Sequence, residues 1–552
     1  MLPMDRTLSS VLAALVAMGA GGLLAAYRAY PAFVGYETPF ASSVRSDDAP
    51  PPVARPVVVF LVDGLRLDVS RGLPFLNELR RRGADLQCRV GSPSFSLPAR
   101  GVLWTGAWAE VHGQLLNFRP RPVRVEHLFE SARRRGLRTA LAASPDVQSL
   151  FPSHIDRRVV YAGEKTVSRS SAEAYTGDLL SLAADARVLL DGDVADLTVI
   201  EIPTTDGAGH SAGGASPVYR AVAEGADLVL RGLASGLDLE RAVLVVTSDH
   251  GHTDAGGHGG DEPEVMEVPL VLAGRGIRPG TTGRAQQIDI APTLAVILGV
   301  PIPRASRGAI LEVWDEAASA GAAERARVAK AQREAADRDA AVVLGATPEE
   351  RTTADMRRRT VGAFLILMAP IAVLIAVTFT PERRFLLPAI GSAAIAGLAY
   401  QALRPVLGLS TSLSALNRDE DLPRFLAINA VLALVLGAAA AAGVTRWAAP
   451  AGLVPRPGDR ALLAALCAVA YLAPFAARGA DVYVRAGFVM EWALVDMRAR
   501  YGLYQDALAA AAVGLLSPLV AAFASVLRAP LDRLRTGDER LGDHARAVGG
   551  RE

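Results

Sequence analysis

Histidine and aspartate residues gather in two glycine-rich segments of this chain. Segment 205–210 reads Thr-Asp-Gly-Ala-Gly-His, and segment 248–260 reads Ser-Asp-His-Gly-His-Thr-Asp-Ala-Gly-Gly-His-Gly-Gly. The chain has 8 histidines, and half of them lie in these two segments. The candidate ligands there are Asp206, His210, Asp249, His250, His252 and His258. Because imidazole and carboxylate groups bind divalent cations and packing alone rarely explains histidines among so many glycines, the segments predict a metal site.

Two further segments carry single groups that suit the same chemistry. Asp63 is followed by Gly64, which permits a sharp turn, although Asp-Gly is also an ordinary turn sequence. Ser96 precedes a helical stretch with Pro98 in its first turn, so its hydroxyl is expected at a helix N-terminus. That position suits a nucleophile with an anionic transition state, but an N-cap serine would also lie there. Ser94 is a minor alternative nucleophile.

The elements that would position these groups are strands alternating with helices. Continuous apolar runs, as expected of strands covered on both faces, occupy 57–62, 197–202, 242–247 and 268–273. Helical patterns occupy 74–82, 125–135, 177–190 and 216–233. Alternation of this kind predicts an α/β domain with a mostly parallel sheet and helices on both faces. The polar segments fall at or just after strand ends, where open α/β sheets bind ligands.

Apolar segments at both ends of the chain predict a membrane protein. Candidate spans are 8–26, 360–378, 385–403, 422–444, 461–476 and 507–527. Segment 8–26 is longer than the apolar core of a signal peptide, which favours an uncleaved anchor over a cleaved signal. Segment 483–504 is amphipathic, with Trp and Tyr, and could lie in the membrane interface. The arginines are nearly balanced between the two sides, so charge alone does not fix the orientation.

These patterns divide the chain into six predicted regions. They are an anchor at 1–28, a Pro-rich linker at 29–56, the α/β domain at 57–303, a charged helical stalk at 304–359, an all-α transmembrane region at 360–527 with about five spans, and an Arg-rich tail at 528–552. The net charge of +1 gives no reason to expect nucleic-acid binding. With only Cys88 and Cys467, a disulfide framework and a cysteine-built zinc site are both excluded.

Taken together, the motifs resemble the alkaline phosphatase superfamily. The resemblance covers about 57–303 and includes Asp-Gly after the first strand, Thr-Asp-x-x-Gly-His, Ser-Asp-His-Gly and Gly-Gly-His-Gly-Gly. It also includes Gln-Ile-Asp-Ile-Ala-Pro-Thr-Leu at 287–294, followed by Leu-Gly-Val-Pro at 298–301. The branch that it looks most like contains the type I phosphodiesterases, the nucleotide pyrophosphatases and the glycosylphosphatidylinositol ethanolamine-phosphate transferases. The transferases also have an N-terminal anchor and several C-terminal spans.

The resemblance implies a site with two divalent cations, with zinc favoured. Asp206, His210 and His258 would hold one cation. The other would be held by Asp63, Asp249 and His250, with Ser96 coordinated as the nucleophile. Asn117 falls where the phosphodiesterases carry a phosphate-binding asparagine, and is the expected oxyanion contact. His112 is expected to be structural, and His252 has no assigned counterpart, so a supporting or solvated role is its default.

The nucleophile segment also departs from this branch. The related enzymes usually carry Thr at the position of Ser96, and Ser-Leu-Pro-Ala-Arg at 96–100 followed by Thr-Gly matches the sulfatase signature, in which Ser or Cys becomes formylglycine. Sulfatases, however, usually open with paired aspartates and use one calcium ion. Segment 205–210 supplies the ligands that a second metal needs, which favours phosphate over sulfate esters.

The predicted function is therefore that of a membrane-anchored zinc phosphodiesterase or phosphoethanolamine-type phosphotransferase. Its expected substrate is a phosphorylated lipid head group, a glycan or another phosphodiester at an envelope surface, and the catalytic domain is expected to be extracytoplasmic. Two alternatives remain, a sulfatase-like hydrolase and a catalytically silent membrane scaffold. The residues do not separate hydrolysis from transfer, because both share the first half-reaction.

Overall fold

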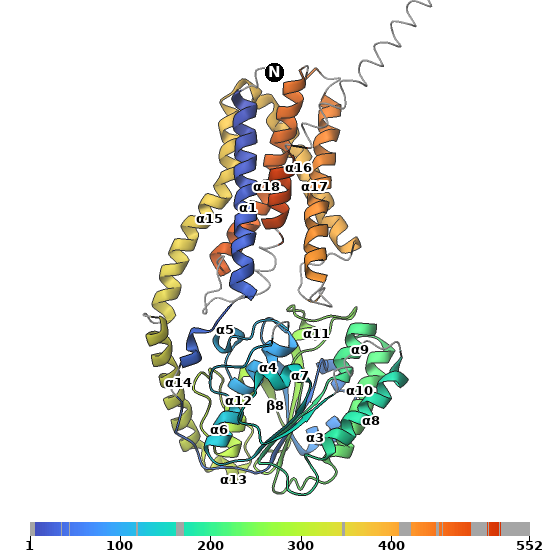
Figure 1. Cartoon of the computed structure of the whole chain (residues 1–552), viewed down its shortest axis with the longest axis vertical. Coiled ribbons are helices and arrows are strands. Elements are labelled where there is room, and N and C mark those ends of the chain that lie inside the picture. Colours follow the sequence, from blue (N-terminus) through green and yellow to red (C-terminus); the bar gives the residue numbers. More distant parts are fainter. Residues whose placement is uncertain are drawn as a thin grey trace, which may run out of the picture.

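The computed structural model contains an α/β domain and a bundle of long helices, placed one after the other along the longest axis (Figure 1). It describes residues 6–34, 36–42, 45–117, 120–161, 171–344, 348–407, 414, 421–448, 452–454, 456–486, 505, 507–517 and 519. The N-terminus of α1 (Arg6–Val34) lies at the end of the bundle away from the α/β domain (Figure 1).

An eight-stranded sheet forms the centre of the α/β domain. Its strands are β1 (Val57–Val62), β2 (Gly83–Arg89), β3 (Thr139–Ala143), β4 (Arg157–Val160), β5 (Leu197–Ile202), β6 (Val243–Thr247), β7 (Glu267–Gly274) and β8 (Thr281–Gln286). Their order is β4-β3-β5-β1-β6-β7-β2-β8, and β7 alone runs antiparallel to both of its neighbours. The predicted mostly parallel sheet is confirmed.

Alternation of side chains along β1 explains why both sheet faces are covered. Val57, Val59 and Leu61 belong to the core on one face, and Val58, Phe60 and Val62 belong to the core on the other. One face packs against α4 (Ser96–Thr105), α6 (Leu128–Arg134), α7 (Pro145–Leu150) and α12 (Ile290–Leu298). The opposite face packs against α3 (Pro74–Arg82), α8 (Ala172–Arg187) and α10 (Pro217–Ala234).

The register of three strands brings their carboxyl ends to one level. Val62 of β1 pairs with Ile202 of β5, and Leu61 pairs with Thr247 of β6. The segments that follow these strands therefore meet at one edge of the sheet. The short helices α2 (Leu67–Ser70), α5 (Ala109–His112), α9 (Thr204–Ala212) and α11 (Pro263–Met266) complete the α/β domain. Of these, α5, α9 and α11 lie at the end of the domain that faces the helical bundle (Figure 1).

The solvated stalk predicted for 304–359 differs from the structure over much of its length. After α13 (Glu316–Ser319), helix α14 (Ala322–Leu344) packs on the α/β domain through Val328, Ala336 and Ala340, which are spaced for one helix face. Arg304 forms an ion pair with Asp339 of α14 at 2.7 Å. The prediction failed because the many charges of α14 concealed a narrow stripe of small apolar residues that is enough to bury one side.

Five helices in the part of the chain that the structure describes are long and apolar enough to cross a membrane. The spans are Arg6–Leu24, Arg359–Thr378, Pro381–Arg404, Leu426–Ala448 and Pro457–Asp481. They lie within α1, α15 (Pro348–Thr378), η3 (Pro381–Phe385) with α16 (Leu386–Val406), α17 (Asp421–Ala448) and α18 (Pro457–Ala486). Helix α18 is central, because it packs against α1, α15, α16 and α17.

The remaining predicted membrane segments are covered only in part. Of the span predicted at 507–527, the structure describes an apolar helix at Ala507–Ser517 and little beyond it. Most of the predicted amphipathic segment 483–504 and the whole tail 528–552 lie outside the described residues.

Candidate active site

The turn after β1 brings Asp63 to the carboxyl edge of the sheet. The Asp63 backbone N–H donates to the Ile202 carbonyl at 3.0 Å, which continues the pairing with β5. Gly64 follows with φ +71°, and a Cβ there would lie 2.9 Å from the Asp206 backbone. Only glycine meets both conditions, so the Asp-Gly motif permits the close approach of the two acidic segments.

Ser96 is the first residue of α4 and is placed at the same edge. Its Oγ lies 3.0 Å from Nε2 of His250. The Leu97 backbone N–H donates to Oδ1 of Asn117 at 2.9 Å, so the Asn117 carbonyl caps α4 beside the serine and leaves the amide NH₂ as a donor. The structure thus brings together Ser96 and Asn117, the predicted nucleophile and oxyanion contact.

Ser94 has a different environment from Ser96. Its Oγ donates to the Gly260 carbonyl at 2.8 Å and accepts from the Gly259 backbone N–H at 3.0 Å. It is fully buried. Because these contacts use the hydroxyl to hold the loop around His258, the alternative of Ser94 as nucleophile is not favoured.

Asp206, His210 and His258 form one group of candidate metal ligands. Asp206 and His210 lie one turn apart on α9, and His258 comes from the glycine-rich loop after β6. Asp206 Oδ1 is 3.5 Å from His210 Nε2 and 3.6 Å from His258 Nε2, and the two Nε2 atoms are 3.1 Å apart. Ligand atoms of a tetrahedral zinc ion lie roughly 3.3 Å apart, so this triangle fits such an ion.

Asp63, Asp249 and His250 form a second group beside the first. His250 Nε2 is 3.4 Å from Asp63 Oδ1 and 3.1 Å from Asp249 Oδ2. Ser96 Oγ lies 3.0 Å from the same His250 nitrogen, so Ser96 joins the three predicted ligands. Asp63 Oδ1 is buried and has no hydrogen-bond partner within the described part of the chain. An unpartnered buried carboxylate oxygen among such neighbours fits a cation.

Hydrogen bonds fix which nitrogen of each histidine faces the candidate metal positions. His258 Nδ1 lies 2.9 Å from the Ser94 carbonyl, and His250 Nδ1 lies 3.1 Å from the Gly251 carbonyl. A carbonyl can only accept, so each Nδ1 carries hydrogen and each Nε2 presents a lone pair in the neutral ring. The two rings stack at 3.7 Å between centroids, which places the two ligand groups side by side.

Arg100 supplies a buried positive charge behind the second group. It is 1% exposed and donates to Asp63 Oδ2 at 2.6 Å, and it also donates to Asp249 and Glu201. Despite its burial, the three carboxylates raise the pKa of Arg100 well above its usual value. One guanidinium does not neutralise three ionised carboxylates, so a metal cation would complete the charge balance.

The pKa values of the carboxylates in the site shift in different directions. Burial opposes ionisation of Asp249, yet Arg100 and His250 hold its pKa below the usual range. Asp206 is likewise held well below the usual pKa, by His210 and His252, against the effect of burial. Burial is the main cause that raises the pKa of Asp63, which keeps its charge only if a further cation is near.

His252, left without an assigned role by the sequence, contacts the first ligand group. Its Nε2 lies 2.8 Å from Asp206 Oδ1, and the ring is fully buried. A Cβ on Gly209 would lie 2.4 Å from this ring, so the glycine makes room for it. Burial lowers the pKa of His252 to about 4, so the ring is neutral and can donate one hydrogen bond to the carboxylate. His252 therefore orients Asp206, and a solvated role is excluded.

Replacing His252 by phenylalanine is expected to weaken the binding of a divalent metal by roughly 10–100-fold, because Asp206 loses the partner that orients it while the ring shape is kept. Metal retention during titration with a chelator measures this loss. His252→Asn, which keeps an N–H donor, should bind the metal more tightly than His252→Phe. Equal metal affinity in wild type and His252→Phe would show that the hydrogen bond is unimportant.

His112 lies apart from the ligand groups, in a packed position. Its ring fills the space beside Gly101, where a Cβ would be 2.3 Å from the His112 Cε1. Its Nδ1 accepts from the Gln114 backbone N–H at 3.2 Å. Burial lowers the pKa of His112 to about 3. The expected structural role is consistent with these contacts.

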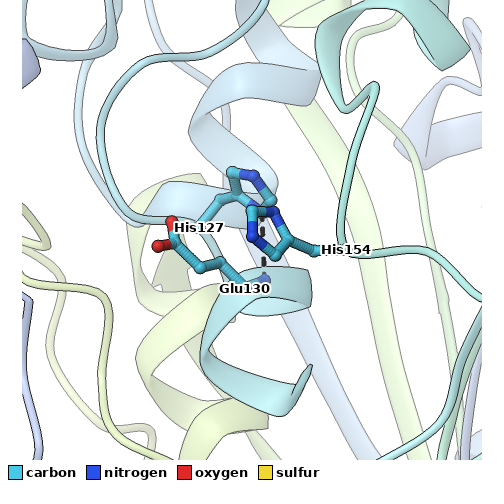
Figure 2. Close-up of side chains that lie close together, drawn as sticks. All are labelled: His127, Glu130 and His154. Atoms are coloured by element: carbon cyan, nitrogen blue, oxygen red, sulfur yellow. Dashed lines mark hydrogen bonds between the residues drawn. The ribbon is translucent and has the colours of Figure 1, made fainter. Parts of the chain in front are cut away.

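His127, Glu130 and His154 form a further cluster at α6 whose groups already have protein partners. Figure 2 shows the two imidazole rings beside each other and the Glu130 carboxylate turned to one side. That carboxylate accepts from Arg45 Nε at 2.8 Å, and the Glu130 backbone N–H donates to His127 Nδ1 at 3.3 Å. His127 thus caps α6, which explains the cluster without a metal.

Stability is expected to fall below about pH 6.5 in part because of His127, since burial lowers its folded pKa to about 3 from 6.5. Between these values the unfolded chain binds a proton that the folded chain excludes. At pH 5 the loss is up to about 2 kcal/mol. His127→Asn keeps a capping acceptor and should reduce the fall in thermal midpoint between pH 7.5 and pH 5. An identical fall in both proteins would contradict the prediction.

With the geometry established, comparison with known proteins gives a consistent result. Residues 57–267 match the family model of the type I phosphodiesterase / nucleotide pyrophosphatase. The matched range contains every ligand and nucleophile candidate described above, and it confirms the resemblance inferred from the motifs.

The chain is similar to GPI ethanolamine phosphate transferase 2, catalytic subunit, of Homo sapiens, at 27% identity over 48% of this chain and 28% of that protein. It is also similar to GPI ethanolamine phosphate transferase 1 of Mus musculus, at 25% identity over 47% of this chain and 32% of that protein. The chain thus spans about a third of these relatives or less. Murine ectonucleotide pyrophosphatase / phosphodiesterase 5 aligns over 45% of this chain and 96% of its own at 16% identity, with a TM-score of 0.37.

Proposed function

We propose that this chain is a membrane-anchored, metal-dependent phosphodiesterase or phosphoethanolamine-type phosphotransferase with Ser96 as nucleophile. The observation that carries the proposal is the meeting of Ser96 Oγ with His250 Nε2 at 3.0 Å, inside the group of Asp63 and Asp249 and next to the group of Asp206 and its histidines. A hydroxyl in such a group is placed for attack on phosphorus. The family match over 57–267 supports the same reaction class.

Each residue then has a defined part in the reaction. Ser96 Oγ gives up its proton and forms a bond to phosphorus while the P–O bond on the opposite side breaks, so that the alcohol of the diester leaves with a proton and a phosphoseryl intermediate forms. Water or an acceptor alcohol then attacks phosphorus, the Ser96–phosphorus bond breaks, and the proton of the attacking hydroxyl returns to Ser96 Oγ. Asn117, whose carbonyl is fixed by the Leu97 N–H, offers its amide NH₂ to an equatorial phosphate oxygen. Two zinc ions, held by the two ligand groups, would lower the pKa of the attacking hydroxyl and neutralise phosphate charge.

The position of the site supports a substrate carried by the membrane. The edge of the sheet that carries the ligands faces the helical bundle, and α5, α9 and α11 lie between the sheet and the bundle (Figure 1). A phosphorylated lipid head group or a lipid-linked glycan would reach this edge directly. We propose that the domain lies on the extracytoplasmic side of the membrane. Helix α1 begins at the end of the bundle away from the domain, and the sequence favours an uncleaved anchor over this helix (Figure 1).

Turnover by the purified full-length chain tests the proposal. Bis-p-nitrophenyl phosphate should be cleaved in the presence of zinc, with activity lost after chelation and restored by zinc. The same preparation should cleave p-nitrophenyl sulfate far more slowly. Preference for the sulfate, with formylglycine at Ser96 in the mass spectrum, would support the sulfatase alternative suggested by residues 96–100. Zinc binding without turnover of any ester would support the scaffold alternative.

A further inference from the structure

Ser414 brings the membrane-spanning half of the chain into contact with the loop that carries His258. It lies between α16 and α17, and it is 3% exposed. Its Oγ accepts a hydrogen bond from the Gly260 backbone N–H at 2.9 Å and lies 2.7 Å from Glu262 Oε2, to which it donates. One hydroxyl therefore holds both a backbone group and a side chain of the same loop.

The contact continues by hydrogen bonds to a candidate metal ligand. The Gly260 carbonyl accepts from Ser94 Oγ, and the Ser94 carbonyl accepts from His258 Nδ1 at 2.9 Å. Ser94 and His258 are both buried, so water does not replace these bonds readily. The route from Ser414 to His258 thus passes through Gly260 and Ser94, and ends at the hydrogen bond that fixes the tautomer of the ring.

Glycines set the path of the loop, and hydrogen bonds hold it in two parts. Gly256, Gly257 and Gly259 have φ values of +99°, +86° and +111°, which only glycine adopts freely. At Gly259 a Cβ would lie 2.3 Å from the Phe95 ring, so the loop passes close to the segment that precedes Ser96. Thr253 holds the first part of the loop through hydrogen bonds with Gly256 and Gly257. The part at Gly259 and Gly260 is held by Ser94 and Ser414.

We propose that Ser414 is a positioning residue of the active site, through which the membrane-spanning region fixes the His258 loop. The proposal rests on the proposed function for its effect on turnover, but not for its effect on the loop. It means that the α/β domain is incomplete as a catalyst without Ser414. The loss of one side chain in the membrane-spanning half should then change metal binding in the other half.

The test compares Ser414→Ala with Ser414→Thr in the full-length protein, with Ser10→Ala as the matched control. The Ser10 hydroxyl donates to the Arg6 carbonyl in the first turn of α1, which begins at the end of the bundle away from the α/β domain (Figure 1). Ser414→Ala should weaken zinc binding at the site that contains His258 by roughly fivefold, since both hydrogen bonds of Ser414 to the loop are lost. The kcat for a diester should fall by a similar factor with KM little changed. Ser414→Thr keeps the hydroxyl, so its zinc affinity and its kcat should both lie within about twofold of the wild type.

Hydrogen exchange of residues 256–262 in zinc-free protein separates this inference from the proposed function. Exchange should be roughly fivefold faster in Ser414→Ala than in wild type or Ser10→Ala, whether or not any ester is cleaved. If exchange and zinc affinity of Ser414→Ala match the wild type, the inference is wrong. If exchange and zinc affinity change as expected but no phosphodiester is cleaved by the wild type, the proposed function fails and the positioning role stands.

Discussion

Ser96→Ala is expected to lower kcat for a phosphodiester by about 10³-fold or more, because the attacking oxygen is removed while the ligand groups remain. The hydroxyl contacts His250 Nε2 at the centre of the second ligand group, and no other hydroxyl of the described chain contacts that nitrogen. Zinc content should fall much less than kcat, since Asp63, Asp249 and His250 are unchanged. Turnover and metal content are measured on the same preparation.

Ser96→Thr distinguishes direct attack by the hydroxyl from a route in which the serine must first be oxidised. A threonine hydroxyl can attack phosphorus, and we expect kcat within about tenfold of the wild type. A threonine cannot give formylglycine, so a sulfatase-type site would be inactive with this residue. Ser235→Ala is a suitable control, because this exposed hydroxyl donates only to the Gly232 carbonyl of its own helix. Full activity of Ser96→Ala would show that Ser96 is not the nucleophile.

Arg100→Met is expected to destabilise the α/β domain by about 3–5 kcal/mol, because three buried carboxylates lose their common counterion. The thermal midpoint should fall by several degrees, and the fall should be smaller at low pH, where protonated carboxylates need no partner. Arg100→Lys should recover only part of the loss, since one ammonium cannot reproduce the planar guanidinium that contacts all three.

A second substitution, at Glu201, shows whether the loss of stability in Arg100→Met comes from unbalanced charge. Glu201 contacts Arg100 but belongs to neither ligand group, so Arg100→Met with Glu201→Gln removes one charge of each sign. This double variant should be more stable than Arg100→Met alone, and zinc should stabilise it further by neutralising Asp63 and Asp249. A midpoint for Arg100→Met equal to the wild type would show that the buried ion pairs contribute nothing to folding.

The strands that the sequence predicted are those with an unbroken apolar run. β1, β5, β6 and β7 are buried on both faces, so composition alone reveals them. By contrast, β8 is an edge strand with largely exposed side chains, and β2 carries polar residues along its length. Their strand state comes from pairing with neighbours distant in sequence, which local pattern does not contain.

The ligand candidates were predictable because each follows a strand of the sheet, and strand ends converge. The contacts of Arg100 and Glu201 were not predicted, since they depend on how α4 packs over β5. Glu201 inside the apolar strand Leu197–Ile202 was a signal that could have revealed these contacts, because a buried charge needs a partner. The position of Ser414 depends on how two halves of the chain meet, for which the sequence carries no local sign.

Helix α15 begins well before its membrane span and continues into it without a break. The span starts at Arg359, so residues 348–358 extend about 16 Å beyond it at 1.5 Å per residue. Together with α14, which is packed on the α/β domain, this extension links the domain to the helical bundle. Under the proposed function, it would set the distance between the candidate active site and the bilayer surface. The scissile bond of a substrate would then have to lie at that distance from the lipid, whatever the chemistry of its head group.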